Sequence, residues 1–203
     1  MLSNLLGANL IYVLVSIIIG LSIHEAMHAF TAHWLGDTTA QDMGRLSLNP
    51  LKHIDPLTTV ALPIITLLIF QVPILAAKPV PFNPARVKYD EFGGALIAAA
   101  GPFTNLGLAV IGALVLHLAT NGILVNFLTT FIVLNVALFV FNILPIPPLD
   151  GSRVLYAFAP EPIQDFMRQI EPYGLFVVFG LVLTGVLIPI LTNLDNYVLR
   201  LLG

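Results

Sequence analysis

The stretch Ser22-Ile23-His24-Glu25-Ala26-Met27-His28 decides how this chain must fold. Two histidines four residues apart on a helix are separated by about 400° of rotation, so both imidazoles leave the same face one turn apart. That arrangement suits two ligands of one tetrahedral zinc ion. Glu25, beside the first histidine, is placed to act as a general base toward a water bound by the metal. We therefore predict a metal site on this helix, with His24 and His28 as ligands.

The residues before this stretch place it in a membrane. No charged residue occurs between Met1 and Ile23, so the first ionisable groups of the chain are His24, Glu25 and His28. Ionisable side chains at membrane depth are costly and usually functional. The alternative is that the helix has already left the bilayer and that the three side chains are simply hydrated. The largely apolar residues of 29–34 argue against that alternative.

Composition supports the same class of protein. The chain has 203 residues, of which 58% are hydrophobic and 9% are charged, with a formal net charge of −3. Soluble domains carry about 25% charged residues, so the chain is predicted to be an integral membrane protein. Its eight basic residues are scattered, which gives no nucleic-acid-binding surface. The absence of cysteine leaves histidine, aspartate and glutamate as metal ligands.

Apolar stretches predict an all-α architecture. We expect a single membrane-embedded domain over residues 1–203, with a catalytic core at about 5–155 and an amphipathic interfacial helix at 161–172. In the third helix, small residues at Ala98–Gly101 and Gly107 predict close helix packing. Residues 45–48 alternate like a short strand in a loop. The stretches expected to be membrane-inserted are, in order, 5–35, 57–77, 93–120, 123–144 and 173–193.

The topology follows from the distribution of positive charge. Seven of the eight Lys and Arg residues lie in three loops, 36–56, 78–92 and 148–172. If the proline-containing stretch 57–77 is re-entrant, these loops share one side, which is the positive-inside pattern. The fold is then a bundle of about four full transmembrane helices plus a re-entrant segment, multi-pass in a prokaryotic plasma (inner) membrane, with the site nearer the cytoplasm. The alternative is that 57–77 spans and that another segment is re-entrant.

A catalytic zinc site needs a third protein ligand. His33 is about 140° round the helix from His28 and points away from the metal. Asp150 follows the proline-broken end of the fourth span, where its carboxylate can turn inward. The alternative is an Asp-Gly turn at the membrane surface. We expect three residues of the polar loop to be ordinary solvated side chains, namely Asp37, Asp42 and His53.

Three motifs together resemble the site-2 protease family of intramembrane zinc metalloproteases. They are His24-Glu25-Ala26-Met27-His28, Gly101-Pro102-Phe103-Thr104-Asn105, and Asn142-Ile143-Leu144-Pro145-Ile146-Pro147-Pro148-Leu149-Asp150-Gly151. Two further segments, 44–50 and 78–84, are similar to loops of the minimal prokaryotic branch, which lacks PDZ and CBS domains. The resemblance covers roughly residues 15–155. Since no PDZ or CBS domain is found here, substrate filtering by such a domain is not expected.

The resemblance implies a reaction and a cofactor. It implies hydrolysis of peptide bonds within or near transmembrane segments, with one Zn²⁺ held by His24, His28 and Asp150. The expected partners are the transmembrane helix of a membrane-protein substrate and the lipid bilayer. By analogy with polar positions of the family, Asn142 or Asn105 is a candidate oxyanion or substrate contact. Hydrogen bonding between helices is an equal alternative for both asparagines.

Two other classes of protein remain open from the sequence. A catalytically inactive membrane scaffold retains the fold, but the intact Glu25 argues against it. A membrane metal-binding or transport protein also places histidine and aspartate in the membrane, although along a path rather than at one depth. A membrane zinc protease of another fold needs a downstream glutamate ligand. The later glutamates all lie in loops or at the interface: Glu91, Glu161 and Glu171.

Overall fold

The computed structural model describes residues 10–53 and 80–203, and every regular element in those ranges is a helix. The α-helices are α2 (Leu10–Trp34), α3 (Thr39–Asp42), α5 (Asp90–Leu116), α6 (Gly122–Asn142), α7 (Asp150–Phe158), α8 (Glu161–Ile170), α9 (Gly174–Leu183) and α10 (Leu187–Leu202). The 3₁₀ turns are η1 (Pro50–Lys52), η3 (Pro84–Arg86) and η4 (Glu171–Tyr173).

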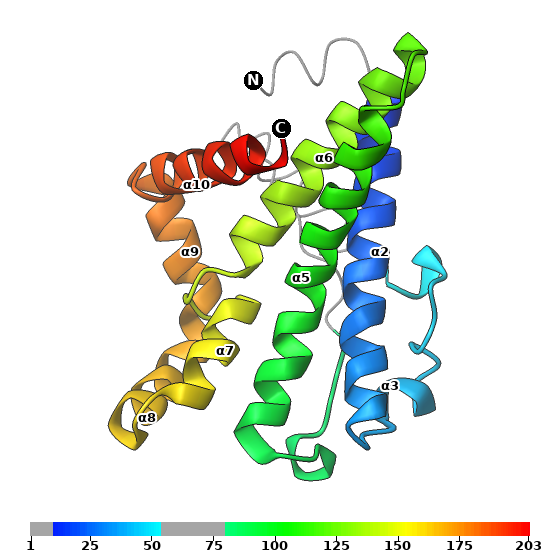
Figure 1. The fold of residues 1–203 in the computed structure, drawn as a ribbon. Helices are drawn as coiled ribbons and strands as arrows, with labels where there is room; N and C mark the ends of the chain where they lie inside the picture. Colours follow the sequence, from blue (N-terminus) through cyan, green and yellow to red (C-terminus); the bar gives the residue numbers. More distant parts are fainter. Residues whose placement is uncertain (1–9, 54–79) are drawn as a thin grey trace.

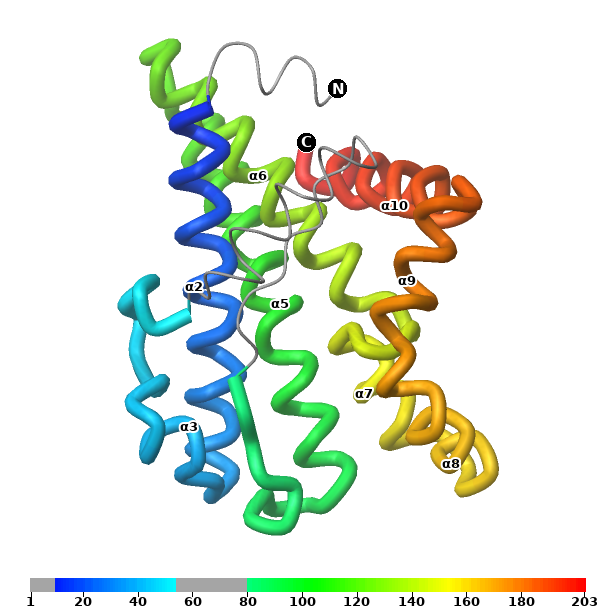
Figure 2. The backbone as a smooth tube through the Cα atoms, turned by 180° about the vertical axis from the view of Figure 1, so that it is seen from behind, coloured from blue at the N-terminus to red at the C-terminus, as the bar shows by residue number. Residues whose placement is uncertain are grey.

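Three long apolar helices form the centre of the molecule. Both views of the chain place α2, α5 and α6 side by side (Figures 1 and 2), and α5 contacts α2, α6 and α7. Four described stretches are long and apolar enough to cross a membrane, namely α2, α5, α6 and the run Glu161–Leu183. The prediction of an all-α membrane protein with about four spans is therefore confirmed.

The C-terminal end of α2 is fixed by a glycine cap. Gly36 has a φ of +104°, and its N–H donates to the carbonyl of His33 at 3.0 Å. The next N–H, from Asp37, donates to the carbonyl of Ala32 at 2.9 Å. This pair of bonds is a Schellman motif, which satisfies the last carbonyls of the helix and requires a left-handed residue where Gly36 stands. The helix thus ends within one residue of the predicted bound at 35.

Small residues allow α5 to pack closely, although partly at different positions from those predicted. A Cβ at Gly112 would lie 3.0 Å from Ile132 of α6, so the two helices approach closely there. A Cβ at Gly107 would meet nothing within 4 Å, so the predicted packing role of Gly107 is wrong. The α5–α6 seam is covered by apolar residues of α10. Its buried core consists of Ala109, Ala113, Ile132, Val136 and Val140.

The C-terminal region is divided differently from the predicted interfacial helix at 161–172 and span at 173–193. The chain turns between α9 and α10 at Gly185, whose φ is +73°. A left-handed residue cannot continue an α-helix, so the predicted last span is two helices. Figure 1 shows α10 lying across the end of α9. The run that can cross a membrane begins earlier, at Glu161, and ends at Leu183.

Two other expectations concern the loops. Residues 45–48, expected to be strand-like, form a loop in which the Ser47 N–H donates to the Arg45 carbonyl at 2.9 Å. The re-entrant segment 57–77 lies outside the described residues, so it stays a prediction. The single-domain division of the chain stays a prediction as well.

Two neighbouring glycines of α5 test the packing of its first turn. A Cβ at Gly93 would lie 2.1 Å from the carbonyl oxygen of Lys88, whereas a Cβ at Gly94 would meet nothing within 4 Å. We expect Gly93→Ala to destabilise the protein by about 1–3 kcal/mol, because the backbone of residues 87–88 must move. Gly94→Ala should leave the melting temperature in detergent unchanged or slightly higher. Equal melting temperatures for the two variants would contradict this packing.

Candidate metal centre

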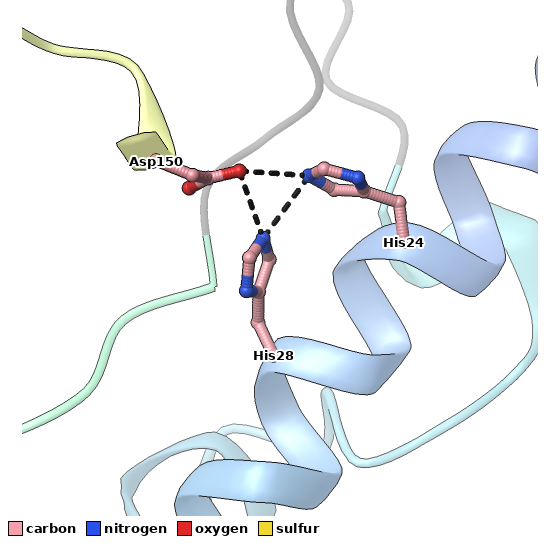
Figure 3. Close-up of side chains that lie close together, drawn as sticks. All are labelled: His24, His28 and Asp150. Carbon is pink, nitrogen blue, oxygen red and sulfur yellow. Dashed lines mark hydrogen bonds and ion pairs between the residues drawn. The ribbon is translucent and has the colours of Figure 1, made fainter. Parts of the chain in front are cut away.

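The two histidines of α2 point to the same place. His24 and His28 are 3% and 8% exposed, and their Nε2 atoms lie 3.0 Å apart. Both side chains leave one face of α2 and converge with Asp150 from a separate helix (Figure 3). The spacing of four residues therefore places both imidazoles on one face of α2, as helix geometry predicts.

Asp150 joins the histidines from the first residue of α7. Its Oδ2 atom lies 3.2 Å from Nε2 of His24 and 3.4 Å from Nε2 of His28. The start of α7 can sit this close to the end of α6 because residue 151 is glycine. A Cβ at Gly151 would lie only 2.0 Å from the carbonyl oxygen of Ile143. The Asp-Gly turn at the membrane surface is therefore not what the chain forms here.

The three ligand atoms have the spacing that a zinc ion requires. Zinc binds nitrogen and oxygen ligands at about 2.0–2.1 Å, and the edge of a tetrahedron is about 1.63 times that length, or about 3.3 Å. The observed edges are 3.0, 3.2 and 3.4 Å. Two imidazoles and one carboxylate also match the ligand chemistry of a catalytic zinc site, in which three protein ligands leave one position open. The residues therefore fit the ion.

Each histidine is oriented by a hydrogen bond from its other ring nitrogen. Nδ1 of His24 donates to Oδ1 of Asn105 at 2.6 Å, and Nδ1 of His28 donates to the carbonyl oxygen of Ile97 at 2.6 Å. Both partners are acceptors, so the proton of each ring sits on Nδ1 and Nε2 presents a lone pair. This is the tautomer that binds a metal, and such partners also hold the ring in place.

All hydrogens of the Asn105 side-chain amide are used in hydrogen bonds within the protein. It is completely buried, and its amide nitrogen donates to the carbonyl of Gly20 at 3.2 Å and to Oδ1 of Asn135 at 2.9 Å. Asn135 in turn donates to the carbonyl of Phe131 at 2.9 Å. Both amide hydrogens of Asn105 are therefore used, which leaves none for a substrate oxyanion. The geometry assigns Asn105 to the orientation of His24 and to hydrogen bonding between helices.

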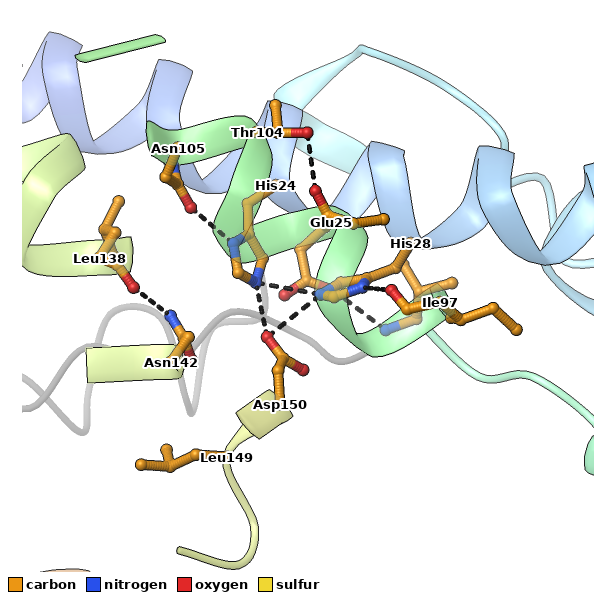
Figure 4. A network of polar contacts seen from close by, with 12 residues as sticks. His24, Glu25, His28, Ile97, Thr104, Asn105, Leu138, Asn142, Leu149 and Asp150 are labelled. Atoms are coloured by element: carbon orange, nitrogen blue, oxygen red, sulfur yellow. Dashed lines mark hydrogen bonds and ion pairs between the residues drawn. The ribbon is translucent and has the colours of Figure 1, made fainter. Parts of the chain in front are cut away.

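Asn142 lies at the C-terminal end of α6, on the Asp150 side of the cluster (Figure 4). Its amide nitrogen donates to the carbonyl of Leu138 at 2.9 Å, and the side chain is half-buried. The second amide hydrogen has no partner among the described residues. Among the described residues, Asn142 thus has one amide hydrogen without an acceptor, whereas both amide hydrogens of Asn105 have one.

Glu25 stands beside the histidine pair (Figure 4) and is 7% exposed. Its Oε2 atom accepts a hydrogen bond from the backbone N–H of Val80 at 3.1 Å. Val80 belongs to the segment that precedes α5 and is 55 residues away in the chain. The carboxylate is therefore both next to the ligand pair and tied to a separate backbone segment.

Sequence analysis missed that one face of α5 forms a wall of the centre. Ile97, Gly101 and Asn105 follow one another at intervals of four, so they lie on one stripe of the helix. A Cβ at residue 101 would lie 2.4 Å from Nε2 of His28 and 2.7 Å from Nε2 of His24. The glycine leaves the space between the ligand atoms open. The four-residue spacing of these three positions in the sequence was the pattern that could have indicated this wall.

The three polar residues of the 36–56 loop do not join the cluster. Asp42 is exposed, as expected, but the expectation of ordinary solvation is wrong for Asp37 and His53. Asp37 is 0% exposed and accepts hydrogen bonds from two segments, and His53 bonds the carbonyl of Ser47 at 2.7 Å. Within the described ranges, the group whose ligand atoms lie close enough to hold a metal is His24, His28 and Asp150.

Comparison with known proteins agrees with this centre. Residues 116–185 match the family described as Peptidase family M50. A Bacillus subtilis (strain 168) protein named "Putative zinc metalloprotease YwhC" is 38% identical over 198 residues, covering 93% of this chain and 84% of the relative. The chain belongs to peptidase family M50, the site-2 protease family.

A second relative of this M50 chain is more distant. A Mycolicibacterium smegmatis protein named "Putative zinc metalloprotease Rip2" is 29% identical over 188 residues, covering 87% of this chain and 68% of the relative. No solved structure matches the chain. As an M50 member it is a zinc metallopeptidase, and the four apolar stretches among the described residues make it a multi-pass membrane protein. The alternatives of an inactive membrane scaffold and of a metal-binding or transport protein are therefore not supported by these relatives.

The wall of the centre generates a prediction about Gly101. A methyl group at this position would occupy the space between the ligand atoms, so Gly101→Ala should abolish stoichiometric zinc binding. Gly107→Ala, on the same helix in open space, should bind zinc as the wild type does. Metal content of the purified variants, measured by atomic emission, checks both. Full zinc content in Gly101→Ala would show that the three ligands are not the metal site.

Loss of the hydrogen bond between His24 and Asn105 should lower the zinc affinity without abolishing zinc binding. Asn105→Ala takes away the acceptor of the Nδ1 proton, so zinc affinity should fall about 10–100-fold. Thr104→Ala removes a neighbouring side chain whose hydroxyl donates to the Ala100 carbonyl of its own helix, and it should leave the affinity unchanged. Competition with a chelator measures both. Equal zinc affinity of the two variants would count against this role of Asn105.

Proposed function

We propose that this M50 metallopeptidase hydrolyses peptide bonds within or near transmembrane segments of membrane proteins. One zinc ion is held by His24, His28 and Asp150, and Glu25 is the general base. The observation that carries the proposal is the triangle of ligand atoms, 3.0 to 3.4 Å on each edge, built on a helix that is long and apolar enough to span the membrane. Substrates that reach it must themselves be in or near the bilayer.

The depth of the site supports an intramembrane reaction. His24 lies roughly 21 Å along α2 from its first described residue, Leu10, and roughly 15 Å before its end at Trp34, at about 1.5 Å per residue. The hydrocarbon core of a bilayer is about 30 Å thick. The ligands therefore sit inside the span, closer to its C-terminal end. A helical substrate must unwind locally there, because a helix hides its peptide bonds.

The orientation in the membrane follows from the described loops. In Figure 1, α3, α7 and α8 lie at the end of the molecule opposite to α10. Positive residues favour the cytoplasmic side, so we place that end of the molecule and the nearby centre toward the cytoplasm of a prokaryotic plasma membrane. The basic residues in or beside the loops at that end are Arg45, Arg86, Lys88, Arg153 and Arg168.

The chemistry is divided between the ion and the protein. Zinc, when bound, lowers the pKa of water and polarises the scissile carbonyl. Glu25 takes the proton of the attacking water and returns it to the leaving amine, and its position beside the histidine pair suits both transfers. The half-buried Asn142, which uses one amide hydrogen within the part of the chain that the structure describes, is the candidate donor to the substrate oxyanion.

Cleavage of a tagged single-pass substrate by purified protein in detergent tests the function. Wild type should cut the transmembrane segment, and Glu25→Gln should reduce kcat by about 10²–10⁴-fold while keeping its zinc, because only the proton transfer is lost. Glu161→Gln, an exposed glutamate of α8, is the matched control and should cut normally. Equal cutting by wild type and Glu25→Gln would rule out Glu25 as the base. Zinc-loaded wild type that cuts no such segment would overturn the intramembrane assignment.

A further inference from the structure

Asp37 is a buried carboxylate that the proposed reaction does not use. It follows the glycine cap of α2, so its backbone is fixed by the Schellman bond to Ala32. Its Oδ1 atom accepts from the backbone N–H of Thr39 at 3.0 Å and from the Thr39 hydroxyl at 2.6 Å. Its Oδ2 atom accepts from the backbone N–H of Asn83 at 2.7 Å. One side chain thus joins the end of α2 to the segment before α5.

The carboxylate is ionised in this position. Burial on its own would raise the pKa of Asp37, but the hydrogen bonds from Thr39 and Asn83, together with the charge of Arg86, hold that pKa below its ordinary value. A charged acceptor makes stronger hydrogen bonds than a neutral one. The bond to Asn83 is therefore a firm attachment rather than an incidental contact.

The segment 80–88 is attached to α2 at three points. The N–H of Val80 donates to Glu25, that of Asn83 donates to Asp37, and that of Lys88 donates to the carbonyl of Leu35 at 2.9 Å. Prolines at 81 and 84 limit the backbone freedom between these points. Apolar contacts complete the attachment, through Val87 and Phe82 packed against Ala32, Leu35 and Ile97.

We infer that Asp37 is a positioning residue for Glu25. The inference rests on the proposed function, in which Glu25 is the general base. Asp37 fixes Asn83, three residues beyond Val80, and the Val80 N–H holds the Glu25 carboxylate beside the ligand pair. Loss of the Asp37 attachment loosens the part of the segment between Val80 and Asn83, and the Val80 N–H then holds Glu25 less firmly.

The metal centre has separate supports, so the two roles can be told apart. The histidines are held from α5 through Asn105 and Ile97, and the third ligand comes from α7. None of these hydrogen bonds involves Asp37 or a residue of the segment 80–88, although the Ile97 side chain also packs against Val87. Loss of Asp37 should therefore reduce catalysis and leave zinc in place.

The first test compares two aspartates of the same loop. In Asp37→Asn, only one side-chain oxygen remains, and it satisfies more donors when it faces the N–H and hydroxyl of Thr39, so the amide N–H₂ faces the Asn83 N–H and that attachment is lost. We expect kcat to fall at least about tenfold, with KM within about twofold and zinc content unchanged. Asp42→Asn is the matched control, since Asp42 is exposed and also faces Arg86, at 3.9 Å. It should keep the wild-type kcat.

A second readout follows the segment directly. The chain has no cysteine, so Ala85→Cys on the exposed η3 turn gives a single site for a spin label. The label should become more mobile in the Asp37→Asn background and should be unaffected by Asp42→Asn. A fall in kcat with unchanged label mobility would overturn the inference, because Asp37 would then act by another route.

A pair of variants at the other end of the bond covers the case in which Asp37→Asn fails to fold. Asn83→Pro removes the N–H that Asp37 accepts, whereas Asn83→Ala keeps it and loses only the cap to Ala85. The inference requires a lower kcat for the proline variant than for the alanine variant. Wild-type kcat in Asp37→Asn, or equal kcat in the two Asn83 variants, overturns the inference while the proposed function stands. Zinc-loaded wild type that cuts nothing overturns both.

Discussion

The meeting of one carboxylate with two imidazoles, on helices far apart in the chain, is the constraint on which the structure depends. The Oδ2 atom of Asp150 comes within 3.4 Å of both His24 and His28, across more than 120 residues of sequence. An ion pair or metal site of this kind is costly in an apolar interior unless every member has a partner. The end of α6, the start of α7 and the middle of α2 must therefore stay in register.

The polar groups around the centre are hydrogen-bonded to one another, as the cost of burying an unpaired polar group requires. The His24 ring, Asn105, Asn135 and the Phe131 carbonyl form a continuous run of hydrogen bonds through α2, α5 and α6. In an apolar environment an unpaired amide would be expensive, so such a run either is satisfied throughout or destabilises the bundle. Here it does two things at once, because it holds three helices together and fixes the tautomer of a metal ligand.

Helix α5 is central because one stripe of it serves both packing and chemistry. Ile97 supplies a carbonyl to His28, Gly101 leaves space for the ligand atoms, and Asn105 orients His24. The first turn of the same helix packs under residues 87–88, which belong to the segment that contacts Glu25. In this arrangement the proposed metal ligands on α2 are oriented by α5, and the proposed base, Glu25, is oriented by the segment 80–88.

The sequence alone determined the features that depend on local periodicity and composition. The four-residue spacing of His24 and His28, the apolar spans and the end of the first span near residue 35 are all patterns that extend over a few turns of helix. Tertiary structure decided the rest, because contacts between residues tens of positions apart leave no local pattern. It placed Asp150 at the histidines, gave Asn105 to His24 rather than to a substrate, and divided the last predicted span at Gly185. It also buried Asp37, whose partner Asn83 is 46 residues away.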